Sequence, residues 1–282
     1  MTSQPITRWT LCSGIYSTGE FNVKKVILVI LLLSFVLFLS SCNSEQKSNT
    51  IQSTTELPET YADTQQDTTQ NKTINAKLLY MGQASIRITT AEGKVIYIDP
   101  YAGKGYEPAA DLILVTHSHY DHNGVDKVKN RNSGCRIITW NEAIADGEHQ
   151  AFDLGYVKVE AVEAGYNRWH DVSECVGYVL TLSDGVSVYV TGDTSKTRQM
   201  PELAVKKIDY AFFCCDGVFN MDLDEAAECA ALVQAKHSIP YHVLAQDGVY
   251  FDRARAEQFK ADNRLIIDEG EEINLLRESE DL

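Results

Sequence analysis

A short stretch of the chain, residues 116–124, holds four side chains that bind metal ions in proteins: His117, His119, Asp121 and His122. An apolar run at 112–115 precedes them and is typical of a buried strand. Side chains alternate in extended chain, so the first three can share one face, and the turn signal Asn123-Gly124 can bring the fourth round to them. Three imidazoles and a carboxylate this close together would repel one another or stand idle without a cation, which predicts a metal site.

Three further residues of the same chemical types stand beside predicted strands. His170 precedes an apolar run at 176–182, Asp193 follows a run at 186–191, and His242 ends the run that begins at Ser238. Together with the first stretch, they place five of the seven histidines in ligand-like positions.

The elements that must position these side chains are short apolar runs separated by turn residues. Further runs of this kind predict strands at 77–80, 85–90, 95–98, 135–139, 157–161 and 210–215. A helix is predicted from Asp222, with the apolar face Ala226, Cys229, Ala230 and Val233 at helical spacing. A second helix near 251–260 and a strand at 264–267 are expected to close the domain.

The N-terminal part of the chain has the composition of a targeting region. Lys24-Lys25 precede an apolar run at 26–39 that is short for a transmembrane helix and is typical of a signal peptide. The run ends in Leu-Ser-Ser-Cys, with Cys42 last, which resembles the lipidation site of a bacterial lipoprotein signal. Residues 1–22 have no place in such a signal, which suggests that translation begins near Val23, from an alternative start codon.

This pattern predicts three parts: a lipoprotein signal peptide at 1–42, a disordered tether rich in Ser, Thr and Gln at 43–75, and a catalytic domain at 76–282. The expected location is the bacterial cell envelope, with the protein anchored to a membrane through lipid on Cys42. A formal net charge of -15 disfavours nucleic acid as a partner. The five cysteines after Cys42 form no pairing pattern and predict no disulfide framework.

Taken in order, the seven candidate ligands resemble the metallo-β-lactamase superfamily. The resemblance covers the whole domain and implies an α/β (α+β) fold, the four-layer αβ/βα sandwich, which the strand-rich halves also favour. It implies that one cation binds His117, His119 and His170, that a second binds Asp121, His122 and His242, and that Asp193 bridges them. Zinc is the expected metal, with manganese or iron as alternatives.

Several further segments resemble one branch of that superfamily, which contains L-ascorbate 6-phosphate lactonase and other metal-dependent hydrolases. They include 97–100, 192–195, 216–222 and 239–242. In that branch a histidine often follows the first glycine of the opening strands, whereas this chain has Gln83 after Gly82. This difference argues against L-ascorbate 6-phosphate as the substrate of this chain.

These observations predict a dinuclear hydrolase in which a metal-bridged hydroxide attacks an ester, lactone or phosphodiester of a small molecule. The resemblance implies that Asp121 accepts the proton. Asp99 is expected either to orient a ligand histidine or simply to cap a strand before Pro100. Two alternatives stay open: a phosphodiesterase acting on lipids, and a lipoprotein that binds metal or a solute without turnover. The oligomeric state is left open by the sequence.

Overall fold

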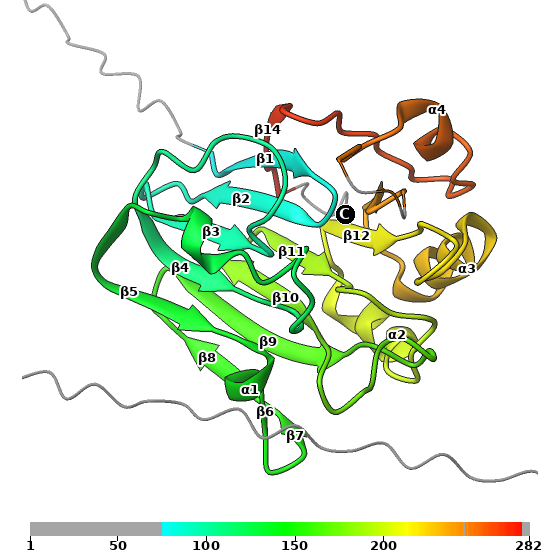
Figure 1. The fold of residues 1–282 in the computed structure, drawn as a ribbon, viewed down its shortest axis with the longest axis horizontal. Helices are drawn as coiled ribbons and strands as arrows, with labels where there is room; N and C mark the ends of the chain where they lie inside the picture. The colour runs from blue at the N-terminus through cyan, green and yellow to red at the C-terminus, as the bar shows by residue number, and fades with distance from the viewer. Residues whose placement is uncertain (1–74, 245, 247, 278–282) are drawn as a thin grey trace, which may run out of the picture. The chain divides into compact units, whose positions relative to one another are not determined.

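The computed structural model describes residues 75–244, 246 and 248–277, and its centre is a pair of six-stranded sheets (Figure 1). The first sheet has the order β14-β1-β2-β3-β4-β5. Its strands are β1 (Lys77–Gly82), β2 (Ser85–Thr89), β3 (Val95–Ile98), β4 (Ala110–Leu114), β5 (Arg131–Ile138) and β14 (Glu272–Asn274). The pairs β3–β4 and β4–β5 are parallel, so these strands end at the same edge of the sheet.

The second sheet has the order β13-β12-β11-β10-β9-β8. Its strands are β8 (Ala151–Asp153), β9 (Val157–Glu163), β10 (Val176–Leu182), β11 (Ser187–Val190), β12 (Tyr210–Cys214) and β13 (His237–Tyr241). Strands β11, β12 and β13 are parallel, whereas β10 runs antiparallel to β11. The start of β10 therefore lies at the edge where the other three strands end. A small hairpin joins β6 (Ile144–Ala145) to β7 (Glu148–His149).

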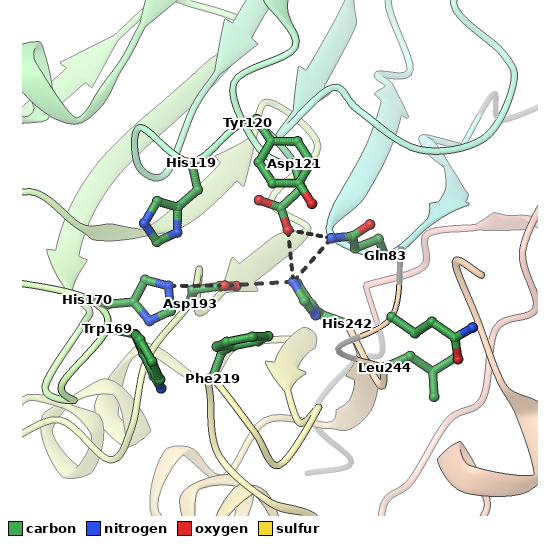
Figure 2. Close-up of a pocket in the computed structure, with 11 residues that line it drawn as sticks. Gln83, His119, Tyr120, Asp121, Trp169, His170, Asp193, Phe219, His242 and Leu244 are labelled. Atoms are coloured by element: carbon green, nitrogen blue, oxygen red, sulfur yellow. Dashed lines mark hydrogen bonds and ion pairs between the residues drawn. The ribbon is translucent and has the colours of Figure 1, made fainter. Parts of the chain in front are cut away.

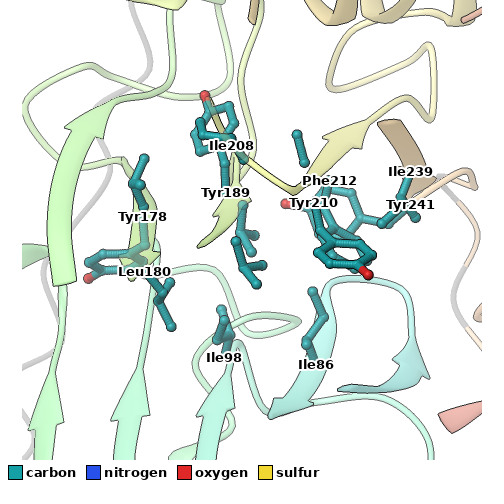
Figure 3. Packing of buried hydrophobic residues seen from close by; sticks show 14 of the residues in the cluster. Ile86, Ile98, Tyr178, Leu180, Tyr189, Ile208, Tyr210, Phe212, Ile239 and Tyr241 are labelled. Atoms are coloured by element: carbon teal, nitrogen blue, oxygen red, sulfur yellow. The ribbon is translucent and has the colours of Figure 1, made fainter. Parts of the chain in front are cut away.

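The two sheets bury a common core between them. Alternate residues of β1, Leu78 and Tyr80, belong to this core, while Leu79 and Met81 belong to a smaller cluster on the outer face of the same sheet. Figure 3 shows Ile86 and Ile98 of the first sheet facing Tyr178, Leu180 and other residues of the second. Both faces of β1 are thus apolar because both are covered, which explains a continuous apolar run rather than a strict alternation.

Helices cover the sandwich only sparsely. The longest among the described residues, α3 (Leu223–Val233), begins at the N-cap Asp222 and buries Ala226, Cys229, Ala230 and Val233, as predicted. The others are single turns: α1 (Trp140–Ala143), α2 (Met200–Leu203), α4 (Arg253–Ala256), and the 3₁₀ turns η3 (Val125–Lys127) and η4 (Ala204–Lys206). The predicted fold class, an α/β sandwich, is confirmed, with helical layers much thinner than the sheets.

Two predicted elements at the end of the domain are wrong. The expected strand at 264–267 is reduced to one isolated bridge between Ser238 and Arg264. The expected helix at 251–260 shrinks to α4. The strand that closes the first sheet is instead β14, which pairs with β1 at its opposite edge from β2.

The predicted signal peptide, its Cys42 and nearly all of the predicted tether lie outside the described residues. Within the described part of the chain, no helix has the length and apolar character needed to cross a membrane. The five cysteines of the domain are unpaired thiols, four of them buried, as the absence of a disulfide pattern predicted.

Candidate functional site

The fold brings all seven predicted ligands to one edge of the sandwich. They come from the loop after β4, the segment before β10, and the ends of β11 and β13. Figure 2 shows those that reach the cavity: His119, Asp121, His170, Asp193 and His242. In the second sheet the ends of β11 and β13 lie at one edge because these strands run in the same direction as β12. The start of β10 lies at the same edge because β10 runs antiparallel to β11. The possible metal-ligand atoms of the seven residues form three groups, and within each group the atoms lie within 4.8 Å of one another. The groups are His117, His119 and His170; His117, His122 and Asp193; and Asp121, His122 and His242.

Asp193 lies between the two histidine groups. Its Oδ2 is 3.4 Å from Nε2 of His170 and 3.7 Å from Nε2 of His242, while its Oδ1 is 3.4 Å from Nε2 of His122. The carboxylate therefore contacts histidines of both groups, and its Oδ2 lies near one ring of each. This is the position that a carboxylate shared by two cations would occupy.

Hydrogen bonds on the far side of three rings turn their Nε2 atoms towards the cluster. Nδ1 of His117 lies 3.1 Å from Oγ1 of Thr116, and Nδ1 of His170 lies 3.1 Å from Oδ1 of Asn167. Nδ1 of His122 lies 2.9 Å from Oδ2 of Asp99. Partners of this kind fix the tautomer and the orientation of metal-binding histidines.

Asp99 is fully buried and does more than end β3. Its Oδ1 accepts a hydrogen bond from the backbone N–H of Thr116 at 2.8 Å, and its Oδ2 accepts one from the Thr116 hydroxyl at 2.7 Å. The carboxylate therefore joins β3 to the loop that carries the first four ligands and also contacts the His122 ring. Its contacts reach both the Thr116 backbone and the His122 ring, and its role in orienting a metal ligand stays a prediction.

The ionisation of the metal-free cluster follows from burial and from the charges of neighbouring side chains. Burial and the nearby His122 hold the pKa of His117 well below its usual value, so this ring is neutral. Burial would raise the pKa of Asp193, but the charges of His122 and His242 hold it well below its usual range. Burial also opposes ionisation of Asp121, but its contact with His242 and the charge of His122 lower its pKa to about 2. Both carboxylates are thus ionised.

Three buried side-chain atoms at the centre of the cluster, two ring nitrogens and one carboxylate oxygen, form no hydrogen bond with the described residues. They are Nε2 of His117, Nε2 of His122 and Oδ1 of Asp193. Buried polar atoms are nearly always hydrogen-bonded, and these three belong to one group within 4.8 Å. Imidazole nitrogens and a carboxylate oxygen in this arrangement fit a divalent transition metal.

Backbone strain is concentrated around the cluster. Of the residues other than glycine with positive φ, four stand in or beside it: Gln83 (φ 49°), Asp99 (φ 45°), Tyr166 (φ 62°) and His242 (φ 46°). Left-handed backbone costs about 1–2 kcal/mol for such residues. It persists where the surrounding structure imposes it, which is typical of functional sites.

Two residues of the site were not assigned a role from the sequence. The amide of Gln83 donates to Oδ2 of Asp121 at 2.6 Å and lies 3.4 Å from Nε2 of His242. Oδ2 of Asp216 lies 3.8 Å from the other ring nitrogen of His242. The sequence signal for Gln83 was its departure from the histidine common in the resembled branch, and for Asp216 its place directly after β12, as Asp193 follows β11.

A cavity of about 300 Å³ opens over the cluster. Five of the seven candidate ligands reach it, and Gln83 lies at its wall. The remaining lining side chains are Tyr120, Trp169, Phe219, Leu244 and Gln246. None of the described residues that line it is lysine or arginine.

The turn before Asp193 leaves no space for a side chain. Gly192 has φ +63°, and a Cβ there would lie 2.6 Å from the carbonyl oxygen of Val176. We expect Gly192→Ala to lower the free energy of unfolding by about 2 kcal/mol and to shift Asp193. Urea denaturation of the metal-free protein measures the first effect.

The matched control is Gly155→Ala. Gly155 has a similar φ of +83° but no atom within 4 Å of the added Cβ. The free energy of unfolding of this variant should therefore fall only by the backbone strain, about 1 kcal/mol. Equal destabilisation by the two substitutions would show that the close approach at Gly192 is unimportant.

Comparison with known proteins places this arrangement in a family. Residues 77–242 match the beta-lactamase superfamily domain. A UPF0173 metal-dependent hydrolase of Thermococcus kodakarensis is 31% identical over 229 residues, which cover 71% of this chain and 99% of that protein. One from Ligilactobacillus salivarius is 32% identical over 192 residues, covering 59% of this chain and 84% of that protein.

Solved structures agree on the fold. Igni18, a metallo hydrolase of Ignicoccus hospitalis, superposes with a TM-score of 0.55 at 19% identity, covering 72% of this chain and all of that one. The metallo-beta-lactamase fold protein YhfI of Bacillus subtilis gives a TM-score of 0.52 at 14% identity, covering 71% of this chain and 99% of that one. The chain belongs to the beta-lactamase superfamily, among its UPF0173 metal-dependent hydrolases.

Proposed function

We propose that the chain is a dinuclear hydrolase of small esters, lactones or phosphodiesters. In this proposal His117, His119 and His170 hold one divalent cation, Asp121, His122 and His242 hold the other, and Asp193 contacts both. The observation that carries it is the placement of Asp193, whose carboxylate lies 3.4 Å from His170 of the first group and 3.4 Å from His122 of the second. The donor set favours zinc, with manganese or iron as alternatives.

Two bound cations would lower the pKa of a water towards neutrality and polarise the oxygen of the scissile bond. The chain itself contributes orientation and proton transfer. Asp121 faces the cavity as a carboxylate, with one oxygen engaged by Gln83. We assign it the role of accepting the proton of the attacking water, and the Gln83 amide holds it in place for this.

A hydrolysis screen on metal-analysed protein tests this function. Lactone, carboxylic ester and phosphodiester substrates are assayed on the purified chain with its metal content measured in parallel. We expect two equivalents of metal and turnover of at least one class, abolished by chelation. Bound metal without turnover of any class would instead support a binding protein.

The resemblance to one branch of the superfamily leads to a more specific prediction about the substrate. We propose that the chain shares the site of the branch containing L-ascorbate 6-phosphate lactonase but not the substrate of that enzyme. The described cavity lining lacks lysine and arginine, and Gln83 replaces the usual histidine. L-Ascorbate 6-phosphate should therefore be turned over much more slowly than an uncharged lactone.

A lipid-directed phosphodiesterase is the second candidate. It is favoured by aromatic side chains exposed at the cavity mouth, among them Tyr120, Trp169 and Phe219, together with the predicted lipid anchor. Turnover of bis(p-nitrophenyl) phosphate with none of lactones or carboxylic esters would select this candidate over the first.

We also propose that the protein is tethered to a membrane of the cell envelope through lipid on Cys42. The support is the order of basic pair, apolar run, small residues and cysteine. Cys42→Ser should block maturation or release the protein from membranes, which fractionation and blotting detect. Unchanged membrane association of the variant would favour an uncleaved apolar anchor.

A further inference from the structure

Exposed apolar side chains gather at the cavity mouth. The described residues with large exposed hydrophobic side chains include Tyr120, Trp169 and Phe219, which are 64%, 46% and 40% exposed and line the cavity. Val172 and Val218, close to two of them in the chain, are also exposed. Clusters of exposed apolar groups mark binding sites, because water would otherwise favour their burial.

Two of these side chains form one wall. The rings of Trp169 and Phe219 meet edge to face, with centroids 5.5 Å apart, beside the cluster of candidate ligands (Figure 2). They come from separate loops, one before β10 and one after β12. Leu244 adds an apolar side chain to the same cavity.

The wall is held rigidly to the site below it. Oδ1 of Asn167 accepts the backbone N–H of Trp169 at 2.9 Å and also contacts the His170 ring. Oδ1 of Asp216 accepts the backbone N–H of Phe219 at 2.7 Å, and its other oxygen lies 3.8 Å from the His242 ring. A single Asn or Asp side chain therefore positions each aromatic residue relative to a candidate ligand.

We propose that Trp169 and Phe219 form a binding subsite for an apolar acyl group of an uncharged carboxylic ester or lactone. This inference rests on the proposed function and narrows its substrate class. The group packs on the two rings while the scissile carbonyl lies over the candidate metal cluster. The lack of lysine and arginine in the described lining favours an uncharged substrate over a phosphate-bearing one.

The first test measures binding without turnover. Trp169 is partly exposed, so a bound apolar group should shift its fluorescence to the blue. The full chain is titrated with hexanamide and with acetamide, uncharged probes that differ by four methylenes. We expect saturable change with hexanamide only, loss of this signal in Trp169→Phe, and weaker binding in Phe219→Ala.

The second test measures selectivity with p-nitrophenyl acetate and hexanoate. A buried methylene is worth roughly fourfold, so four half-buried ones should raise kcat/KM on the order of tenfold. Trp169→Ala and Phe219→Ala should reduce this preference mainly by raising KM for the hexanoate, with metal content unchanged. Trp169→Phe should retain part of it. Val205→Ala is the matched control, because this side chain is 83% exposed and outside the cavity lining. It should change neither the preference for hexanoate over acetate nor the metal content.

The two tests separate the two proposals. A hexanamide signal without hydrolysis of any substrate leaves the subsite standing and removes the proposed function. Hydrolysis with no preference for the longer chain, and no signal from hexanamide, overturns the subsite while the function stands. An equal response of Val205→Ala and Phe219→Ala would also overturn the subsite.

Discussion

Asp193→Asn should bind fewer than two equivalents of metal per chain and lose hydrolytic activity by about a thousandfold. Asparagine has the size of aspartate but only one oxygen and no charge, so it cannot serve two cations in the same way. Loss of several kcal/mol of charge stabilisation in the transition state corresponds to this factor in kcat/KM. Metal analysis of the purified variant and steady-state kinetics measure both effects.

The fold of this variant should be retained. An aspartate after a strand often caps a turn by accepting backbone amides. Oδ1 of Asp193, however, accepts no hydrogen bond from the described residues, and both oxygens face histidines. Turn geometry therefore does not depend on the carboxylate, and circular dichroism of the variant should match the original.

Asp209→Asn is the matched control for Asp193→Asn. Asp209 is also a buried aspartate, but it precedes β12 and accepts hydrogen bonds from the backbone and hydroxyl of Ser187. Its replacement should lower stability and leave metal content unchanged. His149→Ala, at an exposed position, should change neither the stability nor the metal content. Two equivalents of metal with full activity in Asp193→Asn would remove the dinuclear assignment.

Asp99→Asn should lower both the stability of the metal-free protein, by about 3 kcal/mol, and its affinity for metal, by roughly 10- to 100-fold. The carboxylate is fully buried and contacts the N–H and hydroxyl of Thr116 and the ring of His122. An amide can still accept from the N–H but places a donor where an acceptor is needed. Urea denaturation and metal titration measure the two losses.

This variant separates capping from orientation at Asp99. A capping residue would be replaced well by asparagine, which also tolerates the left-handed backbone of this position. Asp184→Asn provides the comparison, since Asp184 accepts the N–H of Val186 in a hairpin turn, at 3.1 Å. If Asp99→Asn behaves like Asp184→Asn in both assays, orientation of His122 by Asp99 is excluded.

The sequence by itself determined the local structure and the chemical types in the site. The predicted strands at 95–98 and 176–182 coincide with β3 and β10, and the helix predicted from Asp222 is α3 with the expected buried face. These features depend on side chains that are near one another in the chain. The seven ligand-type residues were also found this way, because strand ends are recognisable locally and the superfamily resemblance groups them; their role as ligands stays a prediction.

Only the tertiary structure decided which residues surround those ligands. Gln83 meets residues 38 and 159 positions away in the chain, and Trp169 meets Phe219 from a different loop. Residue type did not predict these contacts, because they depend on strand order and on the left-handed backbone that turns Gln83 towards the site. Tertiary structure also decided the wrongly predicted strand at 264–267: this segment reaches the edge of the second sheet beside β13 but pairs there only at Arg264, while β14 closes the first sheet beside β1.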